Sequence, residues 1–168
     1  DVENSRFTYS NVSARRVDGD RVDLEFDVTT HVRIVEPVRS ELVRDVVVQS
    51  LLNPSSTGTR LKTMSLAAGA HEPKVKDALL FAMRHDESLA VRLEALSILS
   101  RDIQDQDVES AVLAALGDDA SVPLRLMALD TLAARRVDHV RLRDAIRRND
   151  RPGEEALMVR LAEYEKRL

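Results

Sequence analysis

The side chains best suited to metal chemistry are histidines and a short run of aspartates. Asp102, Asp105 and Asp107 alternate as in a calcium-binding loop, but such a loop needs Gly at position 107 and Glu in place of Leu113. We interpret these aspartates as turn and helix N-cap residues. The histidines show no i, i+4 spacing that would place two imidazoles on one helix face around zinc. They are His31, His71, His85 and His139.

Other catalytic constellations are missing from the sequence. The 5 glycines are too scattered for a phosphate-binding loop, and the Cys count is 0, which excludes disulfides and thiolate ligands. No pair of carboxylates stands isolated in an apolar setting that would shift a pKa. We therefore predict a non-catalytic protein without metal or cofactor. An enzyme of the lyase or DNA glycosylase type stays a weaker alternative, because helical scaffolds host many functions.

Three arginines recur inside apolar helical patterns. Arg60 and Arg92 are 32 residues apart, Arg125 follows 33 residues later, and each arginine precedes a leucine. Asp86 and Asp119 lie six residues before the second and third arginine. A charge among apolar residues needs carboxylate or carbonyl partners. We interpret the five residues as a structural ladder between repeated units, in preference to an anion-binding groove.

A basic cluster lies near the C-terminus. Residues 136–168 contain nine Lys or Arg against seven Asp or Glu. The cluster is interpreted as a solvated end of the fold, and the alternative is a docking patch for an acidic partner or anionic head groups. Its members are Arg141, Arg143, Arg147, Arg148 and Arg151.

The N-terminal residues 1–37 have the pattern of a β-hairpin. Residues 21–35 alternate apolar and polar side chains, which predicts a strand with one buried face. Asp18-Gly19 is a hairpin turn signal. Upstream, the apolar phase of Phe7 and Tyr9 slips at Val12, which predicts a β-bulge or a loose register. An isolated hairpin is marginal in water, so we expect it to pack on the remaining chain as a cap.

Residues 38–168 change to a helical period and repeat. Two helices for each 32 or 33 residues predict an all-α solenoid of about four helical pairs, because one such unit cannot bury its apolar face alone. A weaker fourth copy aligns residues from 143 and from Arg160 with the earlier units. The expected helices are 39–53, 57–69, 73–85, 88–102, 105–117, 121–136, 138–148 and 153–167.

With Asp in the turn and Arg about six residues later, the unit resembles the HEAT repeat family. The resemblance implies that each Arg bonds turn groups of its own and the neighbouring unit. Asn53-Pro54 departs from it, because Asp is expected there. The resemblance also implies that the second helices line a concave, partner-binding face. Its candidate positions are Lys62, Ser65, Glu94, Ser97, Met127, Asp130 and Ala134.

The order of segments has a closer resemblance. A β-rich lead-in, "FTYSNVSARRVDGDRVDLEFDVTTHVRIVEP", precedes "VVVQSLLNPSSTGTRLKTMSLAAG", "ALLFAMRHDESLAVRLEALSIL" and "SVPLRLMALDTLAARRVD". This order is similar to bacterial membrane-anchored anti-sigma-factor-like proteins with a putative zinc-finger domain, a transmembrane segment and a HEAT-repeat domain. It implies that this chain is the soluble extracytoplasmic part, for sensing or assembly. No metal or sigma-binding residue is carried over.

The composition limits the classes of partner that this chain is expected to bind. The net charge is -4 and Trp is absent, which argues against nucleic acid. The longest apolar runs have six residues, as at 78–83, where a membrane span needs about 20, so no direct membrane insertion is expected from this sequence. The chain starts at Asp1 without Met, so we expect a piece of a longer protein. We predict a protein partner. The alternative to the membrane-anchored regulator is a free cytoplasmic HEAT adaptor.

Overall fold

The computed structural model describes residues 8–18, 21–37, 39–53, 56–67, 72–149 and 151–166. The chain divides into two compact units, Asp1–Glu36 and Pro37–Leu168, each described here by itself. The first is a two-stranded antiparallel hairpin and the second is helical, so the predicted mainly helical class with an N-terminal hairpin is confirmed. The expected packing of the hairpin on the helices stays a prediction.

The hairpin pairs β1 (Thr8–Asp18) with β2 (Arg21–Thr29). Its register shifts between Ser10 and Ser13, where Asn11 takes a positive φ of 52°. The Asn11 amide donates a hydrogen bond of 2.6 Å to the Asp27 carboxylate across the strands. The irregularity moves the apolar phase of β1 from Tyr9 to Ala14, so the predicted break in the register is confirmed.

Two features of the hairpin differ from prediction. The strand expected to reach residue 35 ends at Thr29, and residues 30–36 have no regular secondary structure. The face expected to be buried is not covered within this unit, since Leu24 is 56% exposed and Phe26 43% exposed. A two-stranded sheet has no second layer, so its apolar face has nothing in the unit to pack on. Phe7 and the turn at Gly19 lie outside the described residues.

Eight helices follow in the described residues. Four of these helices begin after a capping side chain: Ser40, Asp105, Ser121 and Asp138 accept N-cap hydrogen bonds, as predicted for Asp105. Pro54, Gly69 and His71 lie outside the described residues. The helices are α1 (Glu41–Leu52), α2 (Thr57–Ala67), α3 (Pro73–His85), α4 (Leu89–Leu99), α5 (Gln106–Asp118), α6 (Val122–Ala134), α7 (His139–Arg147) and α8 (Glu154–Glu165), with a short 3₁₀ helix at Ser100–Asp102.

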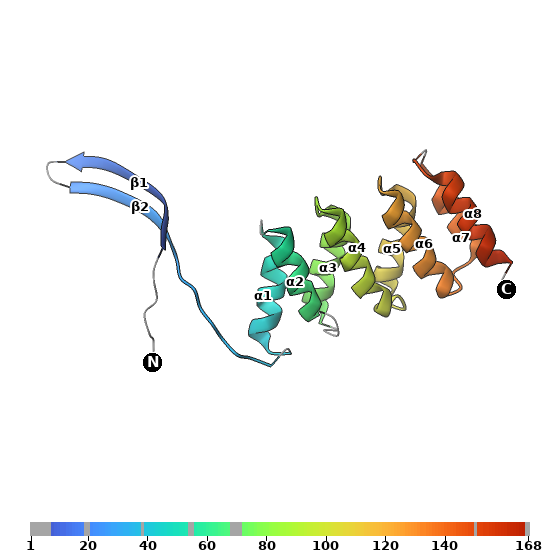
Figure 1. Ribbon diagram of the computed structural model, residues 1–168, viewed down its shortest axis with the longest axis horizontal. Coiled ribbons are helices and arrows are strands. Elements are labelled where there is room, and N and C mark those ends of the chain that lie inside the picture. Colours follow the sequence, from blue (N-terminus) through green and yellow to red (C-terminus); the bar gives the residue numbers. More distant parts are fainter. Residues whose placement is uncertain are drawn as a thin grey trace. The chain divides into compact units, whose positions relative to one another are not determined.

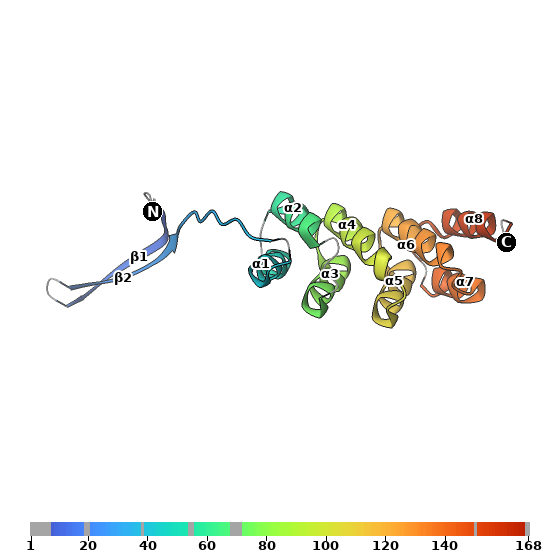
Figure 2. The ribbon, with the colours of Figure 1, turned by 90° about the horizontal axis from the view of Figure 1, so that it is seen from below.

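These helices form two layers. Each odd-numbered helix packs on the next even-numbered helix, to which a short connection joins it, and the two form a helical hairpin. The odd-numbered helices α1, α3, α5 and α7 also contact one another in order, and so do α2, α4, α6 and α8 (Figures 1 and 2). Among the described residues, no helix is long and apolar enough to cross a membrane.

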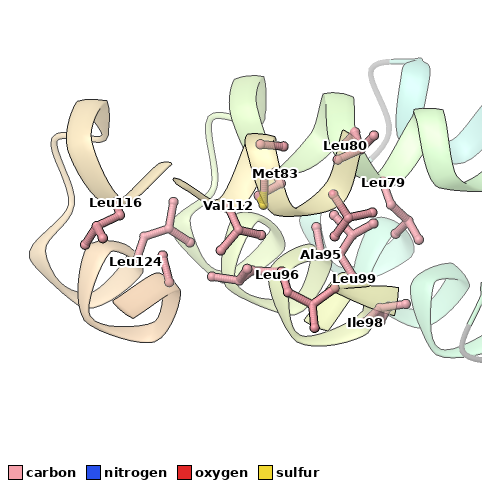
Figure 3. Close-up of a cluster of buried hydrophobic side chains, with 14 of the residues drawn as sticks. Leu79, Leu80, Met83, Ala95, Leu96, Ile98, Leu99, Val112, Leu116 and Leu124 are labelled. Carbon is pink, nitrogen blue, oxygen red and sulfur yellow. The ribbon is translucent and has the colours of Figure 1, made fainter. Parts of the chain in front are cut away.

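The core runs between the layers and is aliphatic. Leu79 and Met83 of α3, Leu96 of α4 and Val112 of α5 are at most 3% exposed and lie side by side (Figure 3). The same apolar positions recur at the repeat spacing, so one continuous core joins neighbouring pairs. This core fixes which side chains of the even-numbered helices face outward.

Candidate functional site

Arg125 is fully buried and is held by backbone carbonyls. Its Nε donates to the carbonyl of Leu116 at 2.8 Å, and its Nη1 to that of Pro152 at 2.8 Å. Its Nη2 donates to the carbonyl of Ile146 at 3.2 Å. Burial disfavours the charged form and lowers the pKa of Arg125, the largest influence on it. The guanidinium therefore joins the ends of α5, α7 and the loop before α8.

Arg60, in the first helical pair, makes a link of the same kind through a carboxylate. Its Nε lies 2.8 Å from Asp86 Oδ2, and its Nη2 donates to Asp86 Oδ1 at 3.0 Å. Both side chains are nearly buried, 6% and 7% exposed. Asp86 also accepts from the Ser88 amide at 2.8 Å, which orders the turn between α3 and α4.

Arg92 connects its own turn with the following one. Its Nη1 donates to the carbonyl of Asp86 at 2.9 Å, and its Nε lies 3.6 Å from Asp119 Oδ2. The carboxylates of the turn residues Asp86 and Asp119 thus pair with the arginine of the preceding helical pair, Arg60 or Arg92. The arginine that follows each aspartate by six residues, Arg92 or Arg125, donates hydrogen bonds to backbone carbonyl oxygens. The guanidinium groups of Arg60, Arg92 and Arg125 are occupied between adjacent pairs, which leaves little of their hydrogen-bonding capacity for a ligand.

The fourth helical pair departs from the expected alignment. Leu157 lies 32 residues after Arg125 and Leu161 lies 32 residues after Leu129, and all four are buried. The structural equivalent of the arginine column is therefore Leu157. The alignment of Arg160 with Arg125 is wrong, because three residues of helix turn the Arg160 side chain to the surface, where it is 41% exposed.

An open groove lies along α6 and α8, the last two even-numbered helices. It has a volume of about 610 Å³. Arg160 crosses the groove and forms a two-point contact with Asp130, at 3.0 and 3.2 Å. The Tyr164 hydroxyl donates to Asp130 at 3.0 Å, and Arg160 also bonds Glu163 at 3.1 Å. The groove is lined by Leu126, Asp130, Glu155, Ala156, Val159, Arg160 and Glu163.

The groove combines an apolar surface with excess negative charge. Val159 is 58% exposed beside Leu126 and Ala156. The lining contains three carboxylates and one guanidinium, and the hydrogen bond that Arg160 donates to Asp130, the largest influence, raises the pKa of Arg160 further above its usual value. This arrangement suits a ligand with an apolar side chain and positive charges.

The predicted partner-binding residues of the even-numbered helices are exposed or partly buried, and Met127 packs in part against the core. Lys62, Glu94 and Met127 occupy equivalent positions, and Val159 of α8 continues their column. Of the predicted set, the structure brings Asp130 into the groove. The groove residues of α8 were missed, because the misaligned fourth copy hid the equivalence of Val159 with Met127.

Most of the basic cluster is neutralised by carboxylates. Arg141 bonds Glu109 at 3.1 Å, Arg143 bonds Glu165 at 2.6 Å, and Arg147 lies 3.8 Å from Glu154. These pairs link α7 to α5 and α8. Arg148 and Arg151 are exposed at the end of the helical unit.

The aspartates at 102, 105 and 107 serve helix structure. Asp105 caps α5 by accepting from the amides of Asp107 and Val108 at 2.9 and 3.3 Å. Lys76 donates to Asp105 at 2.8 Å, and this hydrogen bond holds the pKa of the Asp105 carboxyl below its usual value. Within the described ranges, no three His, Cys, Asp or Glu side chains gather as a metal site requires.

Comparison with family models, curated proteins and solved structures finds no match to this chain.

Proposed function

We propose that the chain is a non-catalytic protein–protein interaction domain whose helices form a short HEAT-like α-solenoid. Three features support the architecture: the two layers of helical pairs, the core that recurs at the repeat spacing, and the arginines that link adjacent pairs. Repeat arrays present a long surface along one layer, and such surfaces bind extended peptides or helices.

The groove of α6 and α8 is the proposed partner-binding site, and it carries the functional proposal. A basic segment with one or more apolar side chains fits it. The apolar residue would cover Val159 and Ala156, and Lys or Arg side chains would face Glu155 and Glu163. Electrostatic complementarity of this kind selects partners and speeds association. The mostly paired basic cluster at Arg141–Arg151 offers less free charge and is the second candidate surface.

The setting of this domain is proposed from the sequence resemblance alone. We propose the extracytoplasmic sensing or assembly part of a membrane-anchored anti-sigma-factor-like regulator, with a free cytoplasmic HEAT adaptor as the alternative. The gene sequence upstream of Asp1 separates them. A Cys/His zinc pattern followed by about 20 apolar residues supports the regulator, and a Met codon directly before Asp1 rejects it.

The binding proposal is tested with fluorescent amphipathic peptides of matched length, one Lys/Leu-rich and one Glu/Leu-rich, by anisotropy. The chain is expected to bind the basic peptide more tightly, and Glu155→Lys/Glu163→Lys should weaken that binding about tenfold or more. The control reverses the same charge on the other layer, at Asp77 and Asp144, which are exposed on α3 and α7. Equal weakening by both double variants would reject the groove as the site, provided that thermal unfolding shows both to be folded.

A further inference from the structure

The hairpin has an open strand edge that continues into an extended segment. β2 pairs with β1 on one side, and no other described strand joins this sheet. The alternation of β2 resumes beyond Thr29 after one polar residue in the apolar phase, Thr30, because Val32 and Ile34 keep the phase of Val22 and Leu24. Residues 21–35 therefore have the pattern of one long strand, of which only the first part is paired.

The polar side chains of this stretch change sign along its length. Arg21 begins this phase, Asp23, Glu25 and Asp27 follow it in the first half, and His31 and Arg33 occupy the second half. All six are exposed. Charges directly opposite one another on neighbouring strands stabilise the pair when their signs differ and destabilise it when they agree. A strand that is acidic at one end and basic at the other is complementary to itself when run antiparallel.

One antiparallel register pairs acidic with basic side chains and apolar with apolar ones over most of this stretch. With a two-fold axis at Val28, Asp23 lies opposite Arg33 of the second copy and Glu25 lies opposite His31 of the second copy. In the other phase, Val22 meets Ile34 and Leu24 meets Val32. Each of these contacts occurs twice, because a two-fold interface is isologous.

The neighbouring registers of the same phase are worse. A shift by two residues in one direction pairs Asp23 with His31 but places Asp27 opposite its own copy and Arg21 opposite Arg33, two kinds of like-charge contact. A shift in the other direction keeps two opposite-charge pairs, Glu25 with Arg33 and Asp27 with His31, but sets Val22 against Glu36 and Asp23 against Val35. The charge pattern thus favours antiparallel self-pairing, and the contacts at the ends of the stretch favour the register centred on Val28.

We propose that two copies of this chain associate through antiparallel pairing of residues 21–35, centred on Val28, into a four-stranded sheet. Residues 30–36, which have no regular secondary structure in the single chain, become strand in the dimer. A two-stranded hairpin is marginal in water, while three or more strands with an apolar face are stable, so pairing stabilises both hairpins. The proposal goes beyond partner binding at the α6–α8 groove and does not depend on it.

The register is tested by cysteine cross-linking of the whole chain, which contains no native cysteine. Val28 is the position that meets itself, with Cβ atoms of opposed residues about 4.5–5.5 Å apart. Val28→Cys is therefore expected to form a disulfide-linked dimer rapidly under mild oxidation. Leu24→Cys is the control, because its own copy lies eight positions away along the paired strand. Equal cross-linking of the two variants, or none at Val28→Cys, would overturn the proposed pairing.

The charge pattern is tested by sedimentation equilibrium. Arg33→Asp places an aspartate opposite Asp23 of the second copy, and this like-charge contact occurs twice in the symmetric dimer. It is expected to raise the dimer Kd about tenfold or more. Asp23→Arg/Arg33→Asp exchanges the two charges; combined with Arg15→Asp, which preserves the ion pair between positions 15 and 23 within the hairpin, it is expected to recover most of the affinity. Arg101→Asp, an exposed change of the same charge in the helical unit, is the control. A monomer at every concentration, an equal effect of Arg101→Asp, or no recovery by the exchange would each refute the dimer.

Discussion

Replacing Arg125 with alanine is expected to destabilise the helical unit by about 3–5 kcal/mol, as for other buried charged groups that lose their partners. Three hydrogen bonds from a charged donor disappear, at 2.8, 2.8 and 3.2 Å. Each is worth about 1.5–3 kcal/mol, and the three carbonyls left behind lose a partner in the interior. Part of this loss is regained, because the folded chain no longer holds a guanidinium out of water.

The effect is expected to be local. Two of the acceptors belong to the last pair, the carbonyl of Ile146 in α7 and that of Pro152 before α8. Stability in repeat arrays is close to a sum of unit and nearest-neighbour terms, so loss of the link should release α7 and α8 first. Hydrogen exchange should therefore show protection falling in 139–165 before it falls in 73–99.

The assay is urea unfolding followed by circular dichroism, together with thermal melting. For a domain of this size, 1 kcal/mol corresponds to about 2–4 °C, so a Tm loss of about 8–15 °C is expected. Arg125→Met keeps most of the volume but loses the hydrogen bonds, and it should cost about 2–3 kcal/mol. The matched control is Arg148→Ala, an exposed arginine expected to change stability by less than about 0.5 kcal/mol.

Two results would refute the reasoning. If Arg125→Ala and Arg148→Ala had the same stability, the buried hydrogen bonds would contribute nothing net. If protection fell evenly along the helices, the guanidinium would not act as a link to the last pair.

Two further perturbations test the packing of neighbouring helices and the pH dependence of stability. Gly117→Ala is expected to destabilise by about 1–3 kcal/mol in urea unfolding, since its Cβ would lie 2.9 Å from the Ala145 carbonyl oxygen. The Cβ of Gly58→Ala would meet only Ser56 Oγ, at 3.9 Å, so this variant should be neutral or stabilising. Equal stabilities of the two variants would contradict the close approach at Gly117. Lys76 lowers the pKa of Asp105, so the charged carboxylate stabilises the fold above the unfolded pKa of about 3.9, and this contribution is lost as pH falls through the lower folded pKa. Asp105→Asn keeps an N-cap acceptor without the charge. As the pH falls from 5 through the folded pKa of Asp105, the free energy of unfolding in urea should decrease less for this variant than for the parent. Parallel pH profiles of the two proteins would contradict this expectation.

Local sequence was sufficient for the elements and for the break in the register of β1. Helix starts follow from side chains that bond amides one turn ahead, as Ser121 does, and such contacts involve only neighbouring residues. The phase slip at Val12 likewise predicted the shift near Asn11, because alternation reports directly which face a strand residue occupies. The end of β2 at Thr29 was not predicted, since alternation continues whether or not a partner strand is present.

Tertiary contacts decided the use of the charged residues. The resemblance implied that each arginine bonds turn groups of its own and the neighbouring unit, without saying which atoms meet. In the structure Arg92 bonds the Asp86 carbonyl, and stacking of successive pairs brings the Asp86 carboxylate to Arg60, 26 residues earlier. The groove also depends on stacking, because the three-residue difference between Arg160 and Leu157 determines which side chain enters the core. By itself, the sequence determined the helices, their repeat and the charge pattern of residues 21–35, because these depend on local periodicity. Which carboxylate meets which arginine, and where a groove opens, is set by distances between residues far apart in the chain, and these exist only once the pairs are packed.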